Sequence, residues 1–312
     1  MANSFAAIAR LLSCPDDGAP LRYVSSELQC SSCARRFALH ADNLAEILPR
    51  HPCELPASVN SAYHQGYLRA FERPYHYDEK SLAWGAEETA SESWVRKRRR
   101  QVAAVQPLIA EGITPGESVL CDIAAGAGYY TFAYAHLFRF VLHCDLSVDN
   151  LSYAWRKARA LGMRNIFFLR ADYFALPFDQ SLSRILCLDT LIRGDAHDSI
   201  LLGAISRSLK PEGCAVVDFH NWWHNPLRRL GLLPENFHEN RSYRRSEADQ
   251  LLHSVGIPDS CVRPFLQEFD PGAASVGFLS KIFPSTRLIY RFAPAPTRAS
   301  HTLVARTPGA RQ

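Results

Sequence analysis

The sequence predicts an α/β fold in which a mostly parallel sheet is covered by helices on both faces. From residue 116 onward, short apolar runs typical of buried strands alternate with helical stretches. The composition, 47% hydrophobic and 21% charged, is that of a globular protein and excludes a disordered, collagen-like or coiled-coil chain. A length of 312 residues suggests about two domains.

Residues 116–312 contain seven apolar runs that we expect to be strands. They are Ser118–Ile123, Phe140–Cys144, Ile166–Arg170, Arg184–Leu188, Cys214–Phe219, Cys261–Gln267 and His301–Arg306. The expected helices are Thr131–Phe138, Ser147–Leu161, Ser199–Leu209 and one that opens at Ser246. Residues 221–243 and 271–299 are expected to be insertions. The apolar stretch Arg287–Phe292 in the second insertion predicts a packed cap, with contact to a lipid-like acceptor or a membrane surface as the alternative.

Residues 1–56 predict a small β module with a linker, and residues 57–115 predict helices. Short alternating segments such as Pro20–Val24 bury little core alone, so a module of this size usually needs a metal or a disulfide. The helical region contains five consecutive cations, Arg96–Arg100. Consecutive residues point in different directions around a helix, so these cations cannot form a single basic face. We therefore expect a solvated helical segment, with contact to phosphate groups as the alternative.

The most informative stretch is Val119–Thr131, where an apolar strand runs into a turn of small residues that opens a helix. Gly126 and Gly128 allow the backbone to approach a ligand closely and to adopt positive φ. Nucleotides bind at such a turn in α/β proteins, at the carboxyl edge of the sheet. Asp145 ends the next strand, where a carboxylate can accept hydrogen bonds from ribose, and Asp172 ends the third, within reach of an adenine amino group.

These motifs resemble, in type and order, those of the class I S-adenosylmethionine-dependent methyltransferases. The matching segments are Asp122, the turn AAGAG at 124–128, Asp145, DYFALPF at 172–178 and LKPEG at 209–213. Ala124 and Glu212 stand where the family has glycine, and neither change removes a needed polar group. The resemblance implies a Rossmann-like sheet of seven strands, a helical lid over residues 57–115 and S-adenosylmethionine as the methyl donor.

The resemblance also implies which residues hold the donor. They are Asp122, Ala124, Gly126 and Gly128 at the methionine end, Asp145 and Leu146 at the ribose, Asp172 and Tyr173 at the adenine, and Asp189 after the fourth strand.

The methyl acceptor is less well defined. The fourth strand lacks the Asn-Pro-Pro-aromatic motif of amino-group methyltransferases, and the chain lacks the Pro-Cys nucleophile of cytosine-C5 enzymes. His220 and His224 follow the fifth strand on the active-site side and are the candidate general bases, unless this segment only begins an inserted cap. Candidate acceptor contacts are Tyr75, Tyr77, Arg193 and Trp222. We expect methyl transfer to O or N of a small molecule, with an rRNA or tRNA methyltransferase and a non-catalytic partner protein as alternatives.

Two pairs of metal-ligating side chains have the spacing of a zinc ribbon, with an aspartate in place of one cysteine. The pairs are Cys14 with Asp17 and Cys30 with Cys33. The segment resembles the small zinc ribbon of methyltransferase activators. Zinc takes four N or S ligands, with carboxylate oxygen also possible. Three alternatives stay open: these four residues bind zinc, His40 or Cys53 completes the set, or packing has replaced the metal.

Buried free cysteines such as Cys121 and Cys144 fit a reducing compartment, so the sequence predicts a cytoplasmic protein. No run of about 18 apolar residues is present, and no transmembrane segment is expected. The net charge of +4 is close to the size of the single run at 96–100 and therefore does not favour a nucleic-acid partner. The oligomeric state is not defined by the sequence.

Overall fold

The computed structural model describes residues 5–83, 86, 88–191, 193–222, 241–257, 262–266 and 287–294. Within these ranges nine strands form one sheet in the order β11-β12-β10-β9-β6-β7-β8-β5-β4. In chain order they are β4 (Leu39–Ala41), β5 (Leu44–Glu46), β6 (Val119–Ile123), β7 (Phe140–Asp145), β8 (Ile166–Arg170), β9 (Leu182–Leu191), β10 (Leu209–His220), β11 (Val262–Leu266) and β12 (Arg287–Phe292). The run from β5 to β10 is parallel, and β12 is antiparallel to both β10 and β11. The predicted mostly parallel sheet is confirmed.

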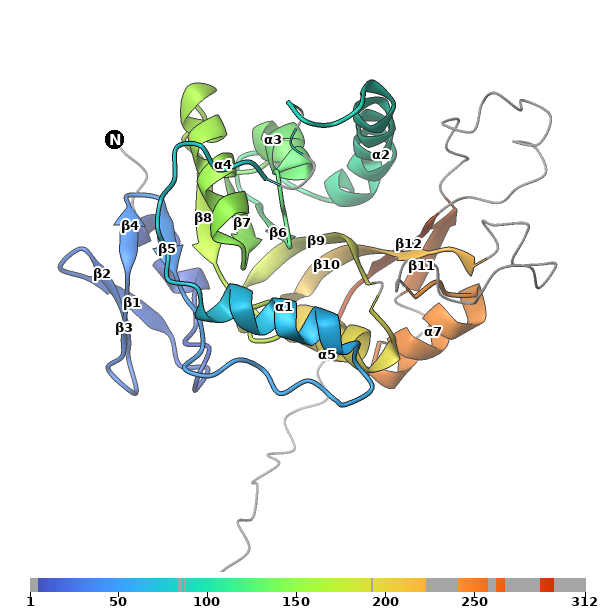
Figure 1. The fold of residues 1–312 in the computed structure, drawn as a ribbon, viewed down its shortest axis with the longest axis horizontal. Helices are drawn as coiled ribbons and strands as arrows, with labels where there is room; N and C mark the ends of the chain where they lie inside the picture. The colour runs from blue at the N-terminus through green and yellow to red at the C-terminus, as the bar shows by residue number, and fades with distance from the viewer. Residues whose placement is uncertain are drawn as a thin grey trace, which may run out of the picture.

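Helices cover the two faces of this sheet (Figure 1). They are α1 (Ser61–Glu72), α2 (Glu92–Ala110), α3 (Tyr129–Tyr134), α4 (Val148–Ala160), α5 (Asp195–Ser208) and α7 (Arg245–Ser254), with short 3-10 turns at Phe5–Ala7, Ala9–Leu11 and Ala135–Leu137. Successive strand residues enter opposite cores: on β7, Val141 packs in the core with α2, α3 and α4, and Leu142 in the core with α5 and α7. Burial on both faces explains why these strands are continuously apolar.

Three of the helices begin at side-chain caps. The side chains of Asn60, Ser91 and Ser147 accept hydrogen bonds from backbone N–H groups in the first turns of α1, α2 and α4. Such caps satisfy donors that a helix start leaves unpaired.

The sheet is wider than the predicted seven strands. Short strands β4 and β5 from the N-terminal region extend it, with β5 parallel to β8. Asn43, in the turn between them, secures this edge: its amide donates to the Ile166 carbonyl at 2.9 Å and accepts from the Trp155 indole at 3.0 Å. Pairing across more than a hundred residues is invisible to local patterns, which is why the extension was missed.

The segment Arg287–Phe292 was expected to be part of an inserted cap, and that expectation is wrong. It forms strand β12, whose residues Ile289 and Tyr290 are buried in the sheet. A cap over a lipid-like acceptor is therefore excluded for this segment. The predicted strand at 301–306 lies outside the described residues.

The N-terminal part also forms a separate three-stranded antiparallel sheet of β1 (Leu21–Val24), β2 (Glu27–Cys30) and β3 (Arg36–Phe37). The predicted short hairpins are thus present, while the domain boundary near residue 56 stays a prediction. Within the described ranges, no helix has both the length and the apolar character needed to cross a membrane.

Candidate functional site

A cavity of about 530 Å³ lies where β6, β7 and β9 end. Its position at the carboxyl ends of parallel strands is the usual ligand site of open α/β sheets. The residues that line it are Tyr63, Trp94, Arg98, Asp122, Ala124, Ala125, Gly126, Ala127, Tyr129, Tyr130, Asp145, Asn150, Tyr173, Leu188, Asp189, Thr190 and Arg193. The walls therefore combine carboxylates, two arginines and several aromatic rings.

The turn between β6 and α3 needs its small residues. Gly128 has φ +79°, and a Cβ there would lie 2.7 Å from the Phe132 ring, so any other residue would be strained and would displace that ring. Ala124, which replaces the family's first glycine, also has positive φ, at +53°. A non-glycine residue in this region carries a modest strain, and alanine is among the smallest that can bear it.

Asp145 fastens this turn to the end of β7. Its Oδ2 accepts from the Gly126 N–H at 2.8 Å, and its Oδ1 accepts from the Ser147 N–H at 2.8 Å and the Asn150 amide at 3.2 Å. Burial raises the pKa of this carboxyl above its ordinary value, and these donors oppose the shift. Because each carboxylate oxygen has about two acceptor sites, Oδ2 retains one for a ligand hydroxyl in the cavity.

Asp122 is the second buried acid of the cavity. It is 2% exposed and accepts a hydrogen bond from the Thr131 hydroxyl at 2.6 Å. Burial raises the pKa of Asp122 to about 7. The Thr131 oxygen lies 3.0 Å from His143 Nδ1, and burial lowers the pKa of His143 to about 3, so this imidazole is neutral. A cationic group placed beside Asp122 would restore its charge.

Arg98 changes the interpretation of the basic run. It is 9% exposed, pairs with Asp189, contacts Gln101 at 3.1 Å and stacks on Trp94, so α2 forms a wall of the cavity. Arg96 pairs with Glu92 one helical turn away. The expectation that the whole run is solvated is wrong for Arg98.

Asp189, the partner of Arg98, has an unusual backbone conformation. Its φ is +61°, and its N–H donates to the carboxylate of Asp218 at 2.7 Å. A left-handed residue held in this way at the end of β9 fixes the direction of the side chain in the cavity.

A second group of polar side chains meets beside the cavity at the start of α5. His197 and Asp198 are both fully buried, and His197 Nδ1 lies 2.6 Å from Asp198 Oδ1. On its other side, His197 Nε2 lies 3.0 Å from the Tyr63 hydroxyl and 3.2 Å from the Tyr173 hydroxyl. The two tyrosine hydroxyls are themselves hydrogen-bonded, and the Tyr243 hydroxyl donates to Asp198 Oδ2 at 2.6 Å.

The structure brings most of the predicted donor-binding residues together. Those that line the cavity are Asp122, Ala124, Gly126, Asp145, Tyr173 and Asp189, and the predicted acceptor residue Arg193 lines it as well. Gly128 is the N-cap residue of α3 and is not among the lining residues. Leu146 does not line the cavity either, and its carbonyl accepts a hydrogen bond from Arg170 at 3.3 Å. Asp172 does not line the cavity: it is 1% exposed and accepts from the Tyr67 hydroxyl at 2.6 Å. Their roles toward the donor stay predictions.

The other predicted acceptor residues lie outside the described lining of the cavity. Tyr75 stacks on His40 with ring centres 4.1 Å apart, and Tyr77 packs edge-on against Trp155. Trp222 lies under the Arg244 guanidinium, and the His220 carbonyl accepts from the Tyr243 N–H at 2.7 Å. The other candidate base, His224, falls outside the described residues.

Several residues that line the cavity were not among the predicted site residues. They are Tyr63, Trp94, Arg98, Tyr129 and Tyr130, together with the adjoining pair His197 and Asp198. The adjacent His-Asp pair directly after the fourth strand was the one local signal that could have marked the second group.

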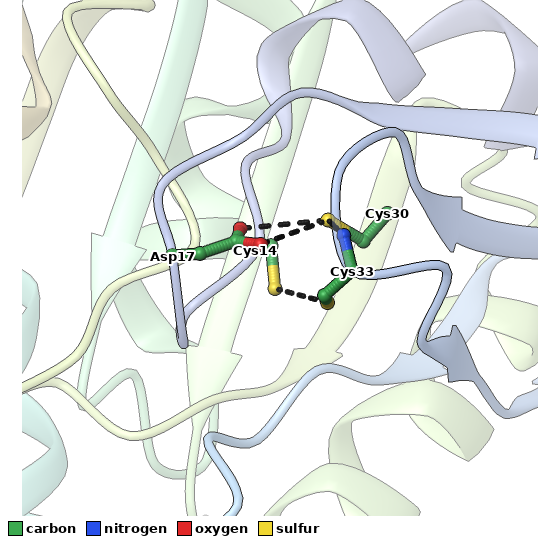
Figure 2. A group of neighbouring side chains, drawn as sticks. All are labelled: Cys14, Asp17, Cys30 and Cys33. Carbon is green, nitrogen blue, oxygen red and sulfur yellow. Dashed lines mark hydrogen bonds between the residues drawn. The ribbon is translucent and has the colours of Figure 1, made fainter.

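The two ligand pairs of the N-terminal module converge. Cys14, Asp17, Cys30 and Cys33 offer ligand atoms that all lie within 4.8 Å of one another (Figure 2). Cys14 Sγ lies 3.9 Å from Cys33 Sγ, and Cys30 Sγ lies 3.4 Å from Asp17 Oδ1. Two sulfurs bound at about 2.3 Å to a tetrahedral ion lie about 3.8 Å apart, so the donor set fits zinc.

The alternative ligands lie elsewhere. His40 stacks on Tyr75, and the Cys53 thiol faces the Glu54 carbonyl at 3.8 Å. Within the part of the chain that the structure describes, neither residue joins the cluster. Of the two ligand sets considered, the geometry therefore favours Cys14, Asp17, Cys30 and Cys33.

Comparison with known proteins agrees with this fold. Residues 120–213 match the family model described as a methyltransferase domain. Over 124 residues the chain is 29% identical to the ubiquinone/menaquinone biosynthesis C-methyltransferase UbiE of Shewanella sp. (strain W3-18-1), a match covering 38% of this chain and 49% of that protein. UbiE of Shewanella baltica (strain OS155 / ATCC BAA-1091) matches with the same values. The chain thus spans about half the length of the curated relatives it matches.

Two solved methyltransferase structures align with this chain. Geranyl diphosphate C-methyltransferase from Streptomyces coelicolor A3(2) aligns with a TM-score of 0.51 and 14% identity, covering 78% of this chain and 100% of that chain. Magnesium protoporphyrin IX methyltransferase from Synechocystis PCC 6803 aligns with a TM-score of 0.48 and 17% identity, covering 76% and 95%. Residues 120–213 therefore match a methyltransferase domain in sequence, and the described residues share the fold of the Streptomyces coelicolor geranyl diphosphate C-methyltransferase.

Proposed function

We propose that the protein is a methyltransferase that binds S-adenosylmethionine in the 530 Å³ cavity and methylates an O or N atom of a small molecule. The observation that carries the proposal is the position of Asp122, Gly126 and Asp145 on one cavity at the ends of β6 and β7. A cavity of this size is within the range of small-molecule sites.

The residues present fit the proposed donor. The free acceptor site on Asp145 Oδ2 suits a ribose hydroxyl, and the positive-φ turn at Gly126 lets the backbone approach the ligand. Asp122, whose pKa is about 7 without a ligand, would ionise beside a cationic amino group. When bound, S-adenosylmethionine supplies an electrophilic methyl group; the protein's task is to align the acceptor with it and to exclude water.

The cavity walls favour a small planar acceptor over RNA. Aromatic rings from Tyr63, Trp94 and Tyr130 surround it, and the Arg193 guanidinium lies 4.7 Å from the centre of the Tyr63 ring. Since Arg98 is buried and paired, the basic run does not form a continuous cationic face. The names of the UbiE relatives raise a carbon atom as the alternative acceptor, which product identification would distinguish.

The test is transfer of an isotope-labelled methyl group from S-adenosylmethionine into a cell extract, followed by identification of the labelled product. We expect the label on an O or N atom of a small molecule when the wild-type protein is present, and no such product in an extract without the protein. Label in RNA, or binding of the donor without any labelled product, would contradict the proposal.

We also propose that Cys14, Asp17, Cys30 and Cys33 bind a structural zinc ion. Metal analysis of the purified protein should find about one zinc per chain, lost in Cys30→Ser and retained in the control Cys53→Ser, whose thiol lies outside the cluster. Chelation should lower the Tm of the wild type by several degrees, because binding to the folded state alone stabilises it. Protein that is purified without zinc and whose Tm does not rise on addition of Zn²⁺ would contradict this assignment.

A further inference from the structure

We propose that Tyr63, His197 and Asp198 form a relay that takes the proton of the methyl acceptor. The inference rests on the proposed methyltransferase function and identifies the acceptor as a group that must lose a proton, such as a hydroxyl. The candidate bases from the sequence, His220 and His224, have no part in it.

The relay assigns a direction to each hydrogen bond, beginning from the shortest contact of His197. The Asp198 carboxylate, 2.6 Å from His197 Nδ1, holds the proton on that nitrogen, and it accepts further hydrogen bonds from the Tyr243 hydroxyl and the Arg193 N–H. Nε2 of His197 is then an acceptor, and the Tyr63 hydroxyl, at 3.0 Å, is its closest donor. A carboxylate, an imidazole and a hydroxyl in this order are the arrangement that activates a hydroxyl in hydrolases.

Tyr63 and Tyr173 both line the cavity and thus connect the buried pair to the ligand site. The Tyr63 and Tyr173 hydroxyls are hydrogen-bonded to each other, and in the relay the Tyr173 hydroxyl is the donor, because the Tyr63 proton points at Nε2. That oxygen keeps one acceptor site for a proton from the cavity. Tyr63 is therefore the catalytic residue, and His197 and Asp198 are positioning residues that act through it.

The proton balance is complete. The acceptor's proton moves to the Tyr63 oxygen while the Tyr63 proton moves to His197 Nε2. The acceptor's electron pair forms the bond to the methyl carbon, and the electron pair of the broken carbon–sulfur bond remains on sulfur. The positive charge lost from sulfur reappears on His197, where the Asp198 carboxylate stabilises it. No other reactant is needed.

Burial argues against Tyr63 acting as a phenolate base and for a relay in which its hydroxyl passes the proton on. It raises the pKa of Tyr63 to about 12 and that of Tyr173 well above its ordinary value, so both hydroxyls are protonated at neutral pH. The other titratable or charged groups facing the relay are Tyr173 and Asp172 after β8, Cys187 on β9, Arg193 after β9, Asp195 on α5, and Tyr243 and Arg241 before α7.

The test compares Tyr63→Phe and His197→Gln with the controls Tyr23→Phe and His136→Gln, which lie outside the cavity. We expect both relay variants to bind S-adenosylmethionine with a Kd within about threefold of wild type and to lose about 100- to 10,000-fold in kcat for the labelled acceptor of the extract. Their kcat should rise about tenfold per pH unit, because transfer then depends on ionisation of the acceptor in water, while wild type and controls stay flat near neutral pH. Variants that keep the wild-type pH profile would overturn the relay.

A second measurement does not depend on turnover. In the ¹⁵N spectrum of histidine-labelled wild type, the His197 signals, assigned by their loss in His197→Gln, should show a proton on Nδ1 and none on Nε2 at pH 7. A proton on Nε2 would overturn the relay even if transfer is active. Wild type that shows the expected tautomer and fails to bind S-adenosylmethionine would refute the proposed function while leaving the hydrogen-bond order intact.

Discussion

Replacing Arg170 with methionine is expected to lower the free energy of unfolding by about 3–5 kcal/mol. Arg170 on β8 is 1% exposed and pairs with Glu46 of β5. Its Nη2 donates to the carbonyls of Ala70 at 2.8 Å and Phe71 at 3.2 Å, which helix α1 leaves without helical partners at its carboxyl end. One guanidinium thus joins the extended sheet edge to the helix that carries Tyr63.

Methionine has about the length of the aliphatic part of arginine, so the substitution removes the guanidinium and keeps most of the apolar packing. It leaves the Glu46 carboxylate without its partner and the carbonyls at the end of α1 without this donor, which is the costly way to break an ion pair whose arginine is buried. Urea denaturation followed by circular dichroism measures the change. The control Arg22→Met, on an exposed position of β1, should stay within about 0.5 kcal/mol of wild type. A loss below about 1 kcal/mol for Arg170→Met would show that this residue does not hold the two elements together.

The central part of the fold could be predicted because its signals are local. Each strand from β6 to β10 contains a buried apolar run, and the acids Asp122 and Asp145 lie near the carboxyl ends of β6 and β7. Parallel strands end on one edge of the sheet, so placing these acids at one site needed only the strand assignments.

The parts that were missed depend on distant contacts. Strands β4 and β5 have three residues each and acquire their place from pairing with β8. Strand β12 carries arginines at both Arg287 and Arg291, a pattern that resembles a surface segment until the sheet buries the residues between them.

The candidate site also combines residues with a local sequence signal and residues placed by distant contacts. Tyr63 and His197 are 134 residues apart, so their hydrogen bond leaves no trace in the sequence. Arg98 differs from the arginines around it only in facing the cavity, where Asp189 meets it. A run of five like charges does not show which face of the helix is buried, so it could not show which arginine points into the cavity.

Asp145→Ala is expected to weaken binding of S-adenosylmethionine by about 100-fold or more. The substitution removes the acceptor site for a ribose hydroxyl and the hydrogen bonds that fix the Gly126 and Ser147 N–H groups. The ribose hydrogen bond to the charged carboxylate contributes about 1.5–3 kcal/mol, and anchoring of the Gly126 N–H contributes about 0.5–1.5 kcal/mol. The midpoint of their sum corresponds to more than about a hundredfold in Kd. Asp179→Ala, at an exposed position away from the cavity, is the matched control.

Isothermal titration of the three proteins with S-adenosylmethionine is the most direct test of the proposed donor site. The proposal predicts saturable binding by wild type and by Asp179→Ala, and binding by Asp145→Ala that is at least about 100-fold weaker. Absence of binding to wild type, or equal affinity of wild type and Asp145→Ala, would contradict it.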